Sequence, residues 1–149
     1  MKIAFFANGD PKGQPRVKAS RRGNFVHMYT PKVADEWKRN VALAAKAAIG
    51  FPSKPTGGHV YVKIAAYFPR PKSHYRTGKN ADTVKATAPQ YHYGKPDCDN
   101  VAKAILDALT PVGIWNDDAQ VNHLVVLKRW ANGSAGAAIE IEFEESAHD

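Results

Sequence analysis

The sequence contains little cysteine and no long apolar run. Cys98 is the single cysteine in 149 residues, which excludes an internal disulfide and a zinc site built from cysteines. No apolar stretch approaches the ~18 residues of a membrane span. Polar residues at 8–10 interrupt the apolar N-terminus too early for the core of a secretion signal. These absences together favour a cytoplasmic protein that does not associate with membranes.

Acidic residues are also fewer than basic ones. The chain has 14 Asp and Glu and 21 Lys and Arg, which gives a net charge of +7. Segments 9–32 and 69–96 each carry six Lys or Arg and one Asp, a net charge of +5. Basic loops are often only solvated surface, but two of them on one small chain favour a polyanionic partner such as DNA. The side chains expected to contact phosphates are Arg16, Lys18, Arg21, Arg22, Arg70, Lys72, Arg76 and Lys95.

Apolar patterning predicts one α/β (α+β) domain over residues 1–149, with a mixed sheet packed with helices. The hydrophobic fraction of 44% and the charged fraction of 23% are ordinary for a folded domain. The turn signal Asn132-Gly133 predicts that the last two strands pair as a hairpin. Segment 69–96 lacks periodicity and exceeds the usual loop length, so it is expected to be functional or partly mobile. Strands are expected at 2–7, 25–29, 59–68, 121–130 and 137–143.

Two helices are expected. The first has Thr30 as its N-cap and Pro31 in its first helical position, and it ends at Gly50. The second is capped by Asp99 or Asn100 and runs to about residue 109. The apolar face predicted for the first helix consists of Val33, Trp37, Val41, Ala44, Ala45 and Ala48.

Acidic residues gather at the start of the second helix. Asp97 and Asp99 are two residues apart, and in extended backbone such side chains point the same way, so both carboxylates can reach one cation. Asp99, Lys103 and Asp107 follow at intervals of four and share a helical face. The pattern predicts two carboxylates and one lysine around a single point.

Asp117 and Asp118 follow the turn at 111–113, which lets the chain double back, so that one of them can supply a third carboxylate. Hard oxygen ligands favour Mg²⁺ or Mn²⁺. Such an ion polarises a phosphodiester and lowers the pKa of an attacking water. Lys103, one helical turn inside, would stabilise the charged transition state or protonate the leaving oxygen. An acidic site on a basic chain therefore predicts a metal-dependent nuclease.

Each of these residues also has an ordinary structural interpretation. Asp99 can be only an N-cap, with Asp97 facing the positive end of the helix dipole. Lys103 can form a surface pair with Asp107. Two alternatives therefore stay open: a non-catalytic basic DNA-binding module, and a nuclease for other branched DNA.

The acidic pattern resembles the signature of RusA-type Holliday junction resolvases. The opening of the chain, with Gly9, Pro11, Pro15 and Arg16, is similar to the proline- and arginine-containing opening of that family. Segment 69–96 has no counterpart in this resemblance. The matching residues are Asp97, Asp99, Asn100, Lys103, Asp107, Ala108, Leu109, Gly113, Asp117, Asp118, Gln120 and Val121.

The resemblance implies a homodimeric, Mg²⁺-dependent endonuclease, with Mn²⁺ as a substitute, that resolves four-way DNA junctions by paired symmetric nicks in recombination and repair. Carried over by position, Asp97, Asp99 and Asp118 are the catalytic metal ligands. Lys103 is the essential catalytic lysine, and Asp117 can substitute for its neighbour or assist it. The apolar residues Val33, Trp37 and Trp130 are candidates for either the dimer contact or the core of one subunit.

Overall fold

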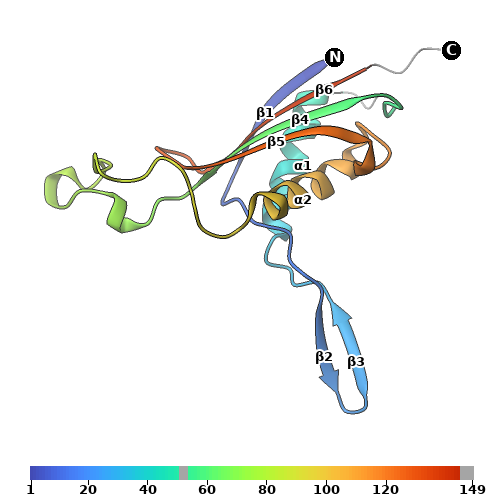
Figure 1. The fold of residues 1–149 in the computed structure, drawn as a ribbon, viewed down its shortest axis with the longest axis horizontal. Coiled ribbons are helices and arrows are strands. Elements are labelled where there is room, and N and C mark those ends of the chain that lie inside the picture. Colours follow the sequence, from blue (N-terminus) through green and yellow to red (C-terminus); the bar gives the residue numbers. More distant parts are fainter. Residues whose placement is uncertain (51–53, 145–149) are drawn as a thin grey trace.

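A four-stranded mixed sheet with two helices on one face forms the body of the protein (Figure 1). The structure is a computed structural model, and it describes residues 1–50 and 54–144. The strand order is β1-β6-β4-β5, with β4 parallel to β5 and the other two pairs antiparallel. The predicted α+β class with a mixed sheet is confirmed. The elements of the body are β1 (Lys2–Asn8), α1 (Asp35–Ile49), β4 (Val60–Phe68), α2 (Cys98–Leu109), β5 (Val121–Trp130) and β6 (Gly136–Phe143).

The core lies between the helices and the sheet. Alternate residues of β4 are buried, as the sequence predicted: Val60, Val62, Ile64, Ala66 and Phe68. The helices contribute Trp37, Val41 and Ala45 from α1 and Val101, Ile105 and Leu109 from α2. Because α2 is apolar on its sheet side and polar at its start, it presents its first turn at the edge of this core.

The predicted hairpin between the last two strands is wrong. β6 pairs with β1 and β4 instead, and β4 separates it from β5. Ile139, for example, lies opposite Phe5 on one side and Ile64 on the other. The turn at Asn132-Gly133 does reverse the chain, but a turn signal does not specify which strand becomes the neighbour. The central place suits β6, because Ala137, Ile139 and Ile141 are fully or almost fully buried.

Both predicted helix starts are displaced. α1 begins at Asp35, with Ala34 as N-cap, so the Thr30 cap is wrong and Val33 lies outside the helix, 70% exposed. Ala48 is also exposed, near the end of α1. α2 begins at Cys98 with Asp97 in the N-cap position, two or three residues earlier than the predicted cap at Asp99 or Asn100. Acidic residues in the first turn of each helix fit the positive end of its dipole.

Two basic projections leave the body (Figure 1). The first is a hairpin of β2 (Lys18–Arg22) and β3 (Phe25–Tyr29), of which only the second strand was predicted. The second is segment 69–96, whose return limb is held to the edge of the sheet. There the amide of His92 donates to the carbonyl of Lys128 at 3.2 Å, and the amide of Trp130 donates to the carbonyl of Gln90 at 2.9 Å. Within the described part of the chain, no helix is long and apolar enough to cross a membrane.

Candidate active site

The start of α2 lies between the bases of the two projections, and a short strap formed by residues 10–16 crosses it. The amide of Gln14 donates to the carbonyl of Asn100 at 3.0 Å. Lys38 of α1 donates to the side-chain oxygen of Gln14 at 3.1 Å. Gly13 allows this approach, because a Cβ there would lie 2.7 Å from Cβ of Pro96. The strap therefore connects the hairpin to the first turn of α2.

Replacing Gly13 by Ala should destabilise the fold by about 1–3 kcal/mol, the usual cost of inserting a methyl group into a packed contact. The new Cβ would also lie 3.2 Å from Cβ of Asn100, so the strap would have to move away from α2. Chemical denaturation measures the change. Gly133→Ala is the matched control, because nothing lies within 4 Å of a Cβ at that position. Equal stability losses in the two variants would contradict the close contact.

Lys128 of β5 fixes the backbone that leads into Asp97. Its ammonium donates to the carbonyls of Gly94 at 2.6 Å and Pro96 at 2.8 Å. His92, which precedes Gly94 in this segment, is 9% exposed and stacks on Phe68, with the two ring centroids 4.1 Å apart. Burial, and then the charge of Lys128, lower the pKa of the His92 imidazole, which keeps the ring neutral at pH 7. Sequence reasoning missed Lys128, because these contacts span more than thirty residues.

A second anchor orients Asp117 and Asp118. The side-chain oxygen of Gln120 accepts the amides of Asn116 at 2.7 Å and Asp117 at 3.1 Å, which completes a capping box. The side-chain nitrogen of Gln120 donates to the carbonyl of Thr56 at 2.7 Å. The sequence pattern contains Gln120, but its spacing alone does not reveal this role.

The charges of α2 and of the turn at Asp117 interact. The pKa of Asp118 is raised, first by its hydrogen bond to Asp117 and then by partial burial. The charges of Asp117 and Asp107 raise it further, while Lys103 opposes them. The pKa of Asp117 is lowered, first by the amide of Ala119, which donates to its carboxylate. The carboxylate of Asp118 is therefore subject to the charges of two other carboxylates, those of Asp117 and Asp107, and of one lysine, Lys103.

Asp97 and Asp99 are both exposed at the first turn of α2. Because the helix begins at Cys98, Asp99 is already helical, and the argument from extended backbone is wrong for this pair. The carboxylate of Asp99 accepts the amide of Asn100 at 3.0 Å. Among residues 1–50 and 54–144, no three His, Cys, Asp or Glu side chains are gathered at metal-binding distances. The ligand set Asp97, Asp99 and Asp118 stays a prediction.

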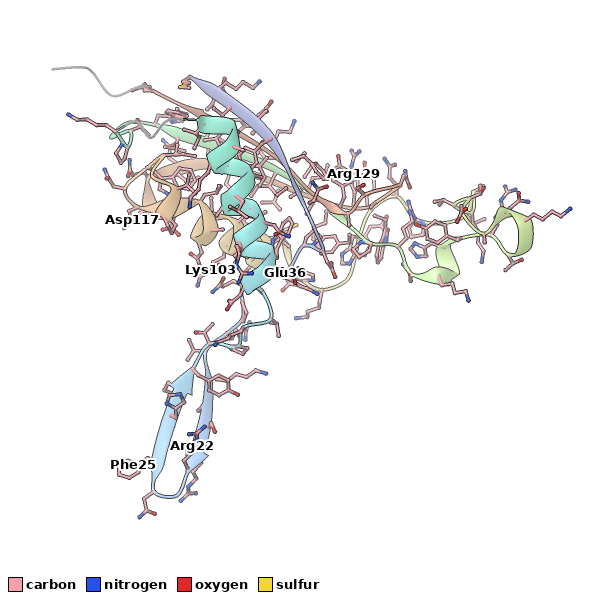
Figure 2. All side chains as sticks on the ribbon, turned by 180° about the vertical axis from the view of Figure 1, so that it is seen from behind. Arg22, Phe25, Glu36, Lys103, Asp117 and Arg129 are labelled. Carbon is pink, nitrogen blue, oxygen red and sulfur yellow. The ribbon has the colours of Figure 1, made fainter. Side chains whose placement is uncertain are left out.

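The basic side chains expected to bind DNA divide into two groups. Arg70 is half-buried and donates to Asn132, Pro89 and the carbonyl of Ala131, so it holds segment 69–96 to the turn after β5. Figure 2 shows Arg22 and Phe25 near the free end of the hairpin, and Lys103 on the side of the body from which the hairpin projects. The other seven predicted contacts are exposed: Arg16, Lys18, Arg21, Arg22, Lys72, Arg76 and Lys95.

Comparison with known proteins identifies the family. The sequence profile described as Endodeoxyribonuclease RusA matches residues 8–142, which include the strap, the hairpin, both helices, β4, β5 and all of β6 except its last residue. The chain is also 34% identical over 126 residues to "Uncharacterized protein YqaN" of Bacillus subtilis (strain 168), an alignment that covers 85% of this chain and 86% of that protein. The chain therefore belongs to the RusA family of endodeoxyribonucleases, DNA endonucleases that act in Holliday junction resolution.

Proposed function

We propose that this protein is a Mg²⁺-dependent endonuclease, with Mn²⁺ as a substitute, that resolves four-way DNA junctions by paired symmetric nicks. One observation carries the proposal: the charges of Lys103, Asp107 and Asp117 act on the carboxylate of Asp118, beside a helix whose first turn lies between the bases of two basic projections. Phosphates attracted by the basic segments would be delivered to the acidic cluster.

The donor chemistry fits a hard divalent cation. The proposed ligands Asp97, Asp99 and Asp118 offer only carboxylate oxygens, which Mg²⁺ and Mn²⁺ prefer. The negative charges of Asp117 and Asp107 raise the pKa of Asp118. A bound cation would neutralise part of this negative charge. When bound, the ion would polarise the scissile phosphodiester and lower the pKa of the attacking water. The exposed carboxylates at the start of α2 would have to converge with Asp118 around it.

Lys103 supplies the positive charge that belongs to the chain itself. It lies one helical turn after Asp99, and its charge acts on Asp118. An ammonium group there would stabilise the negative charge that develops on the phosphoryl oxygens, or protonate the leaving oxygen. Asp107 would orient Lys103, while the ammonium of Lys38, 3.9 Å from the carboxylate of Asp107, connects this group to α1.

A cleavage assay tests the proposal with an end-labelled four-way junction, a flap, a fork and a linear duplex of the same arm sequence, each with and without Mg²⁺. We expect paired nicks in the junction, only with the metal, and an intact duplex. Cleavage in EDTA would contradict metal dependence. Equal cleavage of the duplex, or better cleavage of flaps and forks, would contradict junction selectivity. If the protein binds the junction but does not cleave it with either Mg²⁺ or Mn²⁺, the result would indicate the non-catalytic DNA-binding module.

A further inference from the structure

The hairpin β2–β3 has no hydrophobic core to hold it in place. All five residues of β3 are exposed, and in β2 only Ser20 is half-buried. Large apolar side chains nevertheless lie on it: Phe25 is 80% exposed, Val26 66% and Met28 59%. A lone two-stranded hairpin is marginal in water, and exposed apolar side chains gathered in one place mark an interaction site. The hairpin therefore has the features of an element that a partner completes.

The strand register gives the hairpin two different faces. Directly opposed residues of antiparallel strands lie on the same face, and successive residues alternate between faces. Ala19 opposite Met28 and Arg21 opposite Val26 form a mainly aliphatic face. The other face is aromatic and basic, and on it the rings of His27 and Tyr29 are stacked, with their centroids 6.1 Å apart and an angle of 8°. This aromatic-basic face consists of Lys18, Ser20, Arg22, Phe25, His27 and Tyr29.

We propose that the hairpin inserts its aromatic-basic face into a groove of the DNA, with Phe25 at the tip in contact with the bases. Segment 17–30 has three Lys or Arg and no acid, which suits a polyanion and opposes pairing with an identical hairpin. Five-residue strands are about 16 Å long. The major groove is about 12 Å wide and admits a two-stranded ribbon. Aromatic rings also stack on bases of any sequence where these bases are not paired in a duplex.

This inference rests on the proposed function, because it makes the hairpin the device that presents DNA to the acidic cluster. The strap joins the base of the hairpin to the first turn of α2, through the hydrogen bond from Gln14 to Asn100. DNA bound at the base of the hairpin would therefore lie close to the first turn of α2, where Asp97 and Asp99 are. The groove contact adds to the phosphate contacts expected of Lys18 and Arg22.

Two double variants, one on each face, test the assignment. Phe25→Ala with Tyr29→Ala removes two rings from the aromatic-basic face, and Val26→Ser with Met28→Ser alters only the aliphatic face. Fluorescence anisotropy in EDTA measures the Kd for a labelled four-way junction and for linear duplex, so that cleavage plays no part. We expect the first variant to weaken binding at least about tenfold and the second to leave it within about twofold. Phe25→Trp should retain wild-type affinity.

Thermal unfolding controls for the fold, since these side chains are exposed and both double variants should keep the wild-type melting temperature. Wild-type affinity in the Phe25/Tyr29 variant would overturn the proposal. So would a fall in molecular mass by light scattering in the Phe25/Tyr29 variant, which would indicate that a second copy of the chain occupies the aromatic-basic face. If the protein cleaves no junction but the Phe25/Tyr29 variant loses binding, the hairpin assignment stands and the proposed function fails. If that variant cleaves and binds junctions as the wild type does, the hairpin assignment fails and the proposed function stands.

Discussion

Asp99→Asn should reduce junction cleavage by at least about 10³-fold, which corresponds to about 4 kcal/mol of transition-state stabilisation. The substitution keeps the shape of the side chain but removes the negative charge proposed to hold the metal. Asp97→Asn should act in the same way. Junction binding should be retained or slightly strengthened, because one fewer carboxylate repels the phosphates. Single-turnover cleavage and anisotropy in EDTA measure the two effects separately.

Asp35→Asn is the matched control. Asp35 also lies in the first turn of a helix, α1, so its replacement removes the same interaction with a helix dipole. A cleavage rate near wild type in this variant, beside inactive Asp97 and Asp99 variants, would assign the loss to the site. Comparable rates in all three would refute the ligand assignment, while leaving the proposed DNA-binding hairpin to be judged by its own experiment.

Local patterns predicted those parts of the fold whose contacts are local or repetitive. The alternation of buried and less buried residues in β4 could be predicted from the sequence, because every second side chain faces the helices. The strand Lys18–Arg22 was missed because its sequence has no apolar alternation, and it is held by pairing with β3 rather than by the core. The neighbours of β6 depended on contacts with β1 and β4, far along the chain, that a turn signal does not encode.

The candidate site divides in the same way. Helical spacing placed Lys103 and Asp107 on one face, and the turn after α2 returned Asp118 to within reach of their charges. Sequence reasoning did not find the supports: Gln120 bound to Thr56, and Lys128 bound to the backbone before Asp97. Arg70 was expected to contact DNA because it lies in a basic segment, but its guanidinium forms hydrogen bonds within the protein. Charge counts identify the segment, but they do not identify which cations are free.

Mixing wild-type and Asp97→Asn subunits should convert paired cleavage into single nicks. Each chain carries one proposed acidic site, and resolution of a four-way junction takes two nicks on opposed strands. We therefore propose a two-fold homodimer with two sites facing the same DNA. After subunit exchange at equal concentrations, about half of the dimers would be mixed by simple statistics for a two-fold pair. A cruciform plasmid reports the change as nicked circles in place of linear product, and light scattering reports the mass.

The dimer contact must come from surface that the core leaves free. Trp37 is 2% exposed and belongs to the core, and Trp130 is half-buried against it. Of the three apolar candidates only Val33 remains, 70% exposed just before α1 and close in sequence to the hairpin. Val33→Glu therefore tests whether this region is the contact, since a buried unpaired charge would dissociate the dimer. A monomeric mass for the wild type, or an unchanged ratio of nicked to linear product on mixing, would refute the dimer. Neither result would affect the prediction for Asp99, which is judged by the cleavage rate of its own variant.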